Sequence, residues 1–205
     1  SEADYVARAI RYGPRGTEFE LLERETGWAQ PLRTRLLGRH NVTNILLAIA
    51  VARHLGVEPG AIARAVGRLE PVPHRLQLLE REGVYIIDDA FNSNPVGAQN
   101  ALEILGQFRT GRRFVVTPGM IELGPEEAAF NRELGRLIAQ HADEALLIGP
   151  ERTRPIQEGL QEAGFPRKRV RIFRSLFEAN EHLRQVLRPG DVVLYENDLP
   201  DTYET

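Results

Sequence analysis

The chain has 205 residues, of which 42% are hydrophobic and 27% charged, and its formal net charge is -3. This length accommodates one large domain, or one domain with part of another, and the composition is ordinary for a soluble globular protein. The small negative charge is not that of a protein that binds nucleic acid or an anionic membrane surface. Because the chain has no cysteine, it has no disulfide, thiolate catalyst or cysteine metal site, and we expect a cytoplasmic protein.

Three features of the sequence concern its start, its apolar runs and its one lysine. It begins at Ser1 and its one methionine is Met120, so we expect a processed or excised product. We expect neither a signal peptide nor a membrane span, because no charged-then-apolar segment opens the chain and no apolar run approaches the roughly 20 residues of a membrane-spanning helix. Its one lysine, Lys168, follows Arg167, whereas a phosphate-binding loop of the G-x-x-x-x-G-K-[ST] kind needs a glycine before the lysine. That loop is therefore absent from this chain.

The first seventy residues predict three strands and two helices. The strands are expected over residues 5–12, 17–22 and 31–37, with a turn at Gly13-Pro14-Arg15-Gly16. A helix then begins near residue 40 with Asn41 as its N-cap, and it is apolar on nearly every side as far as residue 55, which predicts burial all round. A second helix is predicted over 59–69, with proline in its first turn.

The stiff segment Glu70-Pro71-Val72-Pro73 predicts a domain boundary, which divides the chain into residues 1–72 and 73–205. After it, strands are expected over residues 75–80, 84–87, 114–117, 145–149, 170–173 and 192–195. Helices are expected from residue 94 and over 126–141, 152–163 and 176–187. This alternation is typical of an α/β domain with a doubly wound, mostly parallel, Rossmann-like sheet.

Ligands of such sheets bind beyond the carboxyl ends of the strands. The most informative segment there is Asp88-Asp89-Ala90-Phe91-Asn92-Ser93-Asn94-Pro95, in which an apolar strand ends in two carboxylates and a polar loop opens a helix. One carboxylate can accept hydrogen bonds from a ribose, and Asn92 and Asn94 can orient a polar substrate. The alternative is structural: the aspartates cap turns and Asn94 caps its helix.

Two further segments are candidates for nucleotide contacts. Asn41 and Asn44 are three residues apart on one face of a helix, and a carboxamide can bond both a donor and an acceptor on an adenine edge. The planar guanidinium of Arg75 suits phosphate oxygens, although an ion pair with a glutamate is the alternative. The histidine spacing does not favour a metal site held by this chain, and no dinucleotide-binding or hydrolase motif is present.

Taken together, these segments resemble the Mur ligase family, which acts on peptidoglycan precursors. The resemblance rests on Gly38-Arg39-His40-Asn41-Val42-Thr43-Asn44, on Pro71-Val72-Pro73-His74-Arg75 and on the acidic loop that follows Ile87, in that order. It implies that residues 1–72 are the strand-and-helix end of a central ATPase domain and that residues 73–205 are the Rossmann-like carboxyl-terminal domain. It also implies that the phosphate-binding loop lies upstream, so that this chain alone is inactive and contains no catalytic residue.

The resemblance also implies a reaction and roles for particular residues. ATP phosphorylates a substrate carboxylate, and an amine then attacks the acyl phosphate, with Mg²⁺ bound mainly by the upstream part. Asn44 is expected at the adenine, Arg75 at the ATP phosphates and Asp89 at the ribose, while Asn92 and Asn94 are expected near the amino substrate. Rotation about residues 70–75 would complete the site. We expect a monomer whose partners are small molecules.

The acidic loop is similar to that of the branch that adds D-alanyl-D-alanine to UDP-MurNAc-tripeptide. After its last strand that branch carries Lys-Gly-[SA]-Arg, whereas this chain has Tyr195-Glu196-Asn197-Asp198-Leu199-Pro200, so a basic patch is predicted to be acidic here. A Mur-like ligase with another substrate, as in folylpolyglutamate or cyanophycin synthesis, is one alternative. A non-catalytic α/β module that binds a nucleotide or a protein is another.

Overall fold

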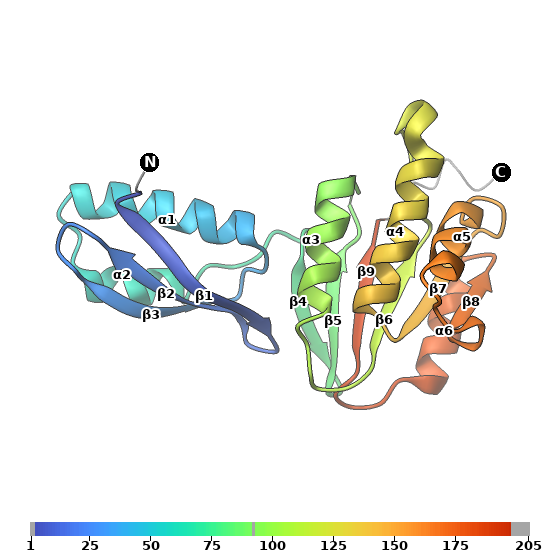
Figure 1. The fold of residues 1–205 in the computed structure, drawn as a ribbon. Helices are drawn as coiled ribbons and strands as arrows, with labels where there is room; N and C mark the ends of the chain where they lie inside the picture. The colour runs from blue at the N-terminus through green and yellow to red at the C-terminus, as the bar shows by residue number, and fades with distance from the viewer. Residues whose placement is uncertain (1–2, 92, 198–205) are drawn as a thin grey trace. The chain divides into compact units, whose positions relative to one another are not determined.

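The structure, a computed structural model, describes residues 3–91 and 93–197. It divides between Val72 and Pro73 into two compact units, each built on its own sheet (Figure 1).

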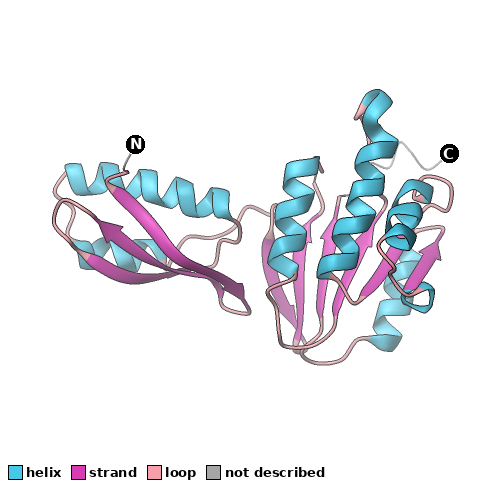
Figure 2. Cartoon of the chain, in the orientation of Figure 1, coloured by secondary structure: helices cyan, strands magenta, loops and turns pink. Residues whose placement is uncertain are grey.

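The first unit is a three-stranded antiparallel sheet with two helices (Figure 2). Its elements are β1 (Tyr5–Gly13), β2 (Gly16–Glu23), β3 (Ala29–Thr34), α1 (Arg39–His54) and α2 (Pro59–Val66). Gly16 has a φ of 93°, and a Cβ there would lie 2.1 Å from the carbonyl oxygen of Thr34, so this turn requires glycine. β3 ends earlier than the predicted residue 37 because the Thr34 hydroxyl accepts a hydrogen bond from the Leu36 N–H and turns the chain.

The prediction that Asn41 caps α1 is wrong. Gly38 is the N-cap residue, with a φ of 97° that glycine adopts without steric cost, so the helix already begins at Arg39. Asn41 lies in the first turn instead, where its amide donates to the carbonyl oxygen of Leu37 at 2.7 Å.

The predicted burial of α1 on all sides is also wrong. Val42, Ile45 and Ile49 are buried against the unit's core, whereas the opposite face carries exposed apolar side chains, which are Leu47 (64% exposed), Val51 (61%) and Leu55 (74%). The physical reason is that only one side of the helix packs against the rest of the unit. That side carries the residues three or four positions apart, and the residues between them face away.

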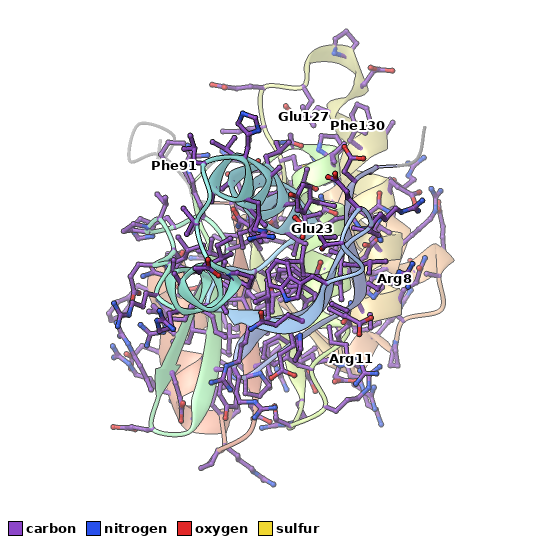
Figure 3. All side chains as sticks on the ribbon, turned by 90° about the vertical axis from the view of Figure 1, so that its left-hand side faces the viewer. Arg8, Arg11, Glu23, Phe91, Glu127 and Phe130 are labelled. Atoms are coloured by element: carbon purple, nitrogen blue, oxygen red, sulfur yellow. The ribbon has the colours of Figure 1, made fainter. Side chains whose placement is uncertain are left out.

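A buried carboxylate joins α1 to the sheet. Glu23 accepts hydrogen bonds from the Tyr5 hydroxyl at 2.6 Å and from Nε and Nη2 of Arg53 at 3.2 Å each. The Arg53 guanidinium also lies over the Trp28 ring, 5.5 Å from its centroid. Figure 3 labels Glu23 among the side chains of this unit. The bonds from Arg53, Thr26 and Tyr5 lower the pKa of Glu23 to about 2.

The second unit is a six-stranded sheet in the order β4-β5-β9-β6-β7-β8. Its strands are β4 (Gln77–Arg81), β5 (Val84–Asp89), β6 (Arg113–Thr117), β7 (Glu144–Ile148), β8 (Val170–Phe173) and β9 (Val192–Glu196). Its helices are α3 (Pro95–Leu105), α4 (Glu127–His141), α5 (Arg154–Glu162) and α6 (Leu176–Val186), with short 3-10 turns at Gly124–Glu126 and Arg167–Arg169. Only the β4–β5 pair is antiparallel.

Helices cover both faces of this sheet. Ala179 and Leu183 of α6 pack with β-strand residues such as Phe114 and Val193, while α3, α4 and α5 lie together on the opposite face (Figure 1). The predicted α/β class with a doubly wound, mostly parallel sheet is therefore confirmed. Ala101, Ile104 and Leu105 of α3 are all buried, as is Phe108 beyond the helix.

Candidate functional site

In the second unit the carboxyl ends of β5, β9 and β6 lie side by side, because the chain passes from β5 through α3 to β6 and the parallel strand β9 later inserts between them. In such sheets ligands bind beyond the carboxyl ends of the strands. Asp89 and Glu196 end β5 and β9 as in-register partners, and Thr117 ends β6.

Asp89 is the half-buried carboxylate of this edge. Its Oδ1 accepts a hydrogen bond from the Leu76 N–H at 3.0 Å. Burial raises the pKa of Asp89 to about 6, and the neighbouring Asp88 contributes, while the Leu76 N–H and the charge of Arg75 act in the opposite direction. At pH 7 Asp89 is mainly ionised, so it can accept hydrogen bonds from a ligand's hydroxyl groups.

Asp88 has a local structural role. Its Oδ1 accepts from the Ala90 N–H at 3.2 Å, and its Oδ2 lies 2.9 Å from Nδ1 of His74. Because successive side chains of a strand point to opposite faces, the carboxylates of Asp88 and Asp89 lie on different faces of the sheet. The turn-capping alternative therefore describes Asp88 well.

Arg75 lies over an aromatic ring beside this edge. Its guanidinium carbon is 4.2 Å from the ring centroid of Phe91, which is 60% exposed on the connection after β5 (Figure 3). A cation–π contact uses the flat face of the guanidinium, so its in-plane N–H groups can still donate to anionic oxygens.

Asn94 caps α3, as the structural alternative predicts. Its Oδ1 accepts a hydrogen bond from the Gly97 N–H at 2.9 Å, and the residue is exposed. The Nδ2 group of the same amide can therefore serve a ligand while the cap is kept. Asn92, the other predicted substrate contact, lies outside the described residues.

Glu196 is a residue that the sequence reasoning did not assign to the site. It is buried, and Ser93 donates a hydrogen bond to its Oε1. Burial and the negative charge of Asp89 raise the pKa of Glu196 to about 8. Glu196 is therefore not part of a surface patch, because its side chain lies in the interior, contrary to the acidic patch predicted at this position. Asp198 lies outside the described residues. A polar residue at the end of an apolar strand is the sequence signal for such a group.

Asn197 and Asn131 hold the neighbouring loop. Nδ2 of Asn197 donates to the carbonyl oxygen of Gly119 at 2.8 Å. The amide of Asn131 bonds both backbone groups of Met120, accepting from its N–H and donating to its carbonyl oxygen at 2.8 Å each. Neither asparagine was among the predicted site residues.

Asn41 and Asn44 lie in the first unit, where both line an apolar groove of about 370 Å³ between α1 and α2. Its walls include Ile45, Ala48, Ile49, Ile62, Val66 and Leu69. An apolar groove with two amides in its lining suits a flat ring that has polar edges.

Within residues 3–91 and 93–197, no group of three His, Asp or Glu side chains is arranged to hold a metal ion. In the same described part, every helix is too short or too polar to cross a membrane.

Comparison with known proteins identifies the second unit. A family model described as "Mur ligase, glutamate ligase domain" matches residues 74–195. The chain belongs to the Mur ligase family. This confirms the resemblance to the family, and the matched residues include the acidic loop.

Named members of the Mur ligase family resemble the chain over most of its length. It is 26% identical over 195 residues to UDP-N-acetylmuramoyl-tripeptide--D-alanyl-D-alanine ligase of Bacillus subtilis, which covers 94% of this chain and 42% of the relative. It is 33% identical over 155 residues to the Escherichia coli ligase of the same name, and this match covers 74% of this chain and 33% of the relative. It is 32% identical over 163 residues to UDP-N-acetylmuramoylalanine--D-glutamate ligase of Chromohalobacter salexigens, and this match covers 79% of this chain and 34% of the relative.

Solved Mur ligases share the fold. The MurF ligase of Thermotoga maritima in complex with ADP superposes with a TM-score of 0.76 at 24% identity, and the match covers 100% of this chain and 45% of that one. The chain spans less than half the length of these relatives.

Proposed function

We propose that the chain is the carboxyl-terminal part of an ATP-dependent ligase of peptidoglycan precursor synthesis. The ligase joins the carboxylate of a UDP-MurNAc-peptide to the amine of an amino acid or dipeptide, with D-alanyl-D-alanine as the first candidate. The observation that carries the proposal is Asp89, a carboxylate at the carboxyl end of β5 in a Mur ligase domain, with Arg75 nearby on the ring of Phe91. We propose a cytoplasmic monomer, with residues 1–72 ending a central ATPase domain.

The nucleotide contacts follow from the chemistry of three side chains. Asn44 would bond the adenine edge while the apolar wall of its groove packs on the ring. Asp89 would accept hydrogen bonds from the ribose hydroxyls, and the in-plane N–H groups of Arg75 would donate to phosphate oxygens. We propose that rotation about residues 70–75 brings these three side chains to one ATP.

The reaction proceeds by acyl activation. A carboxylate oxygen of the first substrate attacks the γ-phosphorus of ATP, and ADP leaves as the acyl phosphate forms. The amine then attacks the acyl carbon, and phosphate leaves as the amide bond forms and the nitrogen loses a proton. The described residues contain no group of three His, Asp or Glu side chains that could hold a metal ion, and the rest of the ligase is proposed to bind Mg²⁺.

The amino substrate is proposed from the acidic loop. Asn94, and Asn92 with it, would contact the amine-bearing substrate, with Nδ2 of Asn94 as the donor. Relatives that add D-alanyl-D-alanine and relatives that add D-glutamate match at similar identities, 33% and 32%, so identity does not separate the two branches. The end of β9, which departs from the first branch, favours a Mur-like ligase with another amino substrate as the second candidate.

The test uses the longer ligase of which this chain is part. We expect R75A and D89N to raise the KM for ATP at least about tenfold, since each removes a charge-assisted hydrogen bond. R171A, which removes an exposed arginine of β8, is the matched control. Unchanged ATP turnover in both site variants would refute the assignment. A panel of D-alanyl-D-alanine, D-glutamate and L-glutamate, each scored by substrate-dependent phosphate release, then decides the amino substrate.

A further inference from the structure

Glu196 and Asn197, at the carboxyl end of β9, contact the loops on both sides of this strand. Glu196 accepts the hydroxyl of Ser93, which lies 103 residues earlier on the connection between β5 and α3. Both side chains are buried, at 1% and 6% exposure. This bond ties the start of α3 to the end of β9.

Asn197 makes the contact on the other side. Its φ of 66° turns the chain sharply after β9, and Nδ2 then donates to the carbonyl oxygen of Gly119 on the connection between β6 and α4. Its backbone N–H donates to the carbonyl oxygen of Asp89 at 3.3 Å. Two consecutive residues therefore bond both loops that flank β9, and one of them also bonds the backbone of Asp89.

This arrangement costs stability. Oε2 of Glu196 is buried and has no hydrogen-bond partner among the described residues. A buried, unsatisfied polar atom is destabilising, and an apolar side chain of similar size would fill the same space without that cost. Polar groups retained in a core at such a cost can serve to select one arrangement of the parts they connect.

We propose that Glu196 and Asn197 are positioning residues, which hold the β5–α3 and β6–α4 connections in one relative arrangement and thereby fix the carboxylate of Asp89 for the nucleotide. That the positioning serves nucleotide binding rests on the proposed function, whereas the positioning itself is a property of this chain without any ligand. The two can therefore fail separately.

Amide hydrogen exchange of the 205-residue chain tests the positioning. The Leu76 N–H, bonded to Asp89, reports on the carboxylate at the end of β5, and the Met120 N–H, bonded to Asn131, reports on the β6–α4 connection. N197G keeps the left-handed backbone and removes only the amide, so we expect exchange at Met120 to accelerate about fivefold, the factor for a hydrogen bond worth about 1 kcal/mol. S93A is expected to do the same at Leu76.

Two further variants separate positioning from general damage. E196Q keeps an acceptor for Ser93 and should restore wild-type exchange at Leu76, whereas E196A should behave like S93A. S175A is the matched control, because Ser175 caps α6 by bonding the Glu178 N–H and contacts neither loop. Wild-type exchange rates at both reporters in N197G and S93A would overturn the proposal. So would an equal rise in β7, at Leu146, because the effect would then be global.

In the longer ligase, S93A and N197G should raise the KM for ATP more than they lower kcat, with E196Q close to wild type. If the exchange results hold but these constants do not change, the positioning stands and its purpose at the nucleotide falls. If R75A and D89N also leave ATP turnover unchanged, the proposed function itself is wrong.

Discussion

Asp89 and Glu196 lie opposite each other on the parallel strands β5 and β9, and their two carboxyls titrate at different pH. Burial is the main cause of both shifts, which raise the pKa of Asp89 to about 6 and that of Glu196 to about 8. Glu196 is the more deeply buried of the two, and the negative charge of Asp89 raises its pKa further. Of these two carboxyls, Asp89 is the one that is mainly ionised near neutral pH, and it is the carboxylate proposed to bind the nucleotide.

These shifts predict how stability depends on pH. A carboxyl whose pKa is raised on folding contributes stability below its unfolded pKa, and this stability is lost as pH rises through the folded pKa. For Glu196 this stability is lost over the pH range from about 4.5 to about 8. Urea unfolding measures this as a free energy of unfolding at pH 5 and at pH 9. Between the two, wild type should lose at least about 1.4 kcal/mol more of this free energy than E196Q loses, which is the value of one pKa unit. A difference that does not change with pH would contradict the shift.

Glu23 predicts the opposite dependence in the first unit. Its pKa is lowered to about 2 by the bonds from Arg53, Thr26 and Tyr5, so its contribution is present above pH 4.5 and is lost as pH falls through about 2. E23Q should destabilise this unit by about 2 kcal/mol at pH 7, because charged hydrogen bonds are lost in a buried place. E25Q, at an exposed position, is the control, and equal unfolding midpoints for the two variants would disprove the role of Glu23.

The close packing of α4 on α5 depends on Gly159. A Cβ at this position would lie 1.9 Å from the backbone oxygen of Arg132, a contact that only backbone movement can relieve. We expect G159A to cost at least about 2 kcal/mol of unfolding free energy, within the range for overpacked sites. G60A makes the same change in α2, where the nearest atom is the mobile end of Arg64 at 3.4 Å, and should be neutral or stabilising. Both are measured by thermal unfolding.

The two faces of α1 should respond differently to the same truncation. Ile49 is 2% exposed and packs in the core of the first unit, so I49A should cost about 2 to 4 kcal/mol. L47A lies on the exposed face and should change stability by less than about 0.5 kcal/mol. Denaturant titration of the 205-residue chain decides this, and a large loss in L47A would restore the prediction of burial on all sides.

The strands and helices of the second unit could be predicted from the sequence because their signals are local. Val192–Glu196 is a short apolar run after Pro189-Gly190, and Pro95 opens α3 behind a capping asparagine. The start of α1 was misjudged because Gly38 and Asn41 are both good helix-start residues, and the backbone angle at Gly38 decides between them.

The site was harder to predict than the fold. The acidic loop follows its strand directly, so Asp89 could be picked out from order alone, and the three family segments together determined the class of the protein. Glu196 was read as part of a charged surface, because a charge pattern says nothing about which elements come to cover it.

By itself, the sequence determined the α/β architecture, the position of Asp89 at a strand end and the membership of the Mur ligases, since these depend on residue order and short-range preference. The tertiary structure alone decided which face of α1 is covered and that Ser93 meets Glu196 across 103 residues. Burial, and with it the protonation of a carboxyl, depends on neighbours that are distant along the chain.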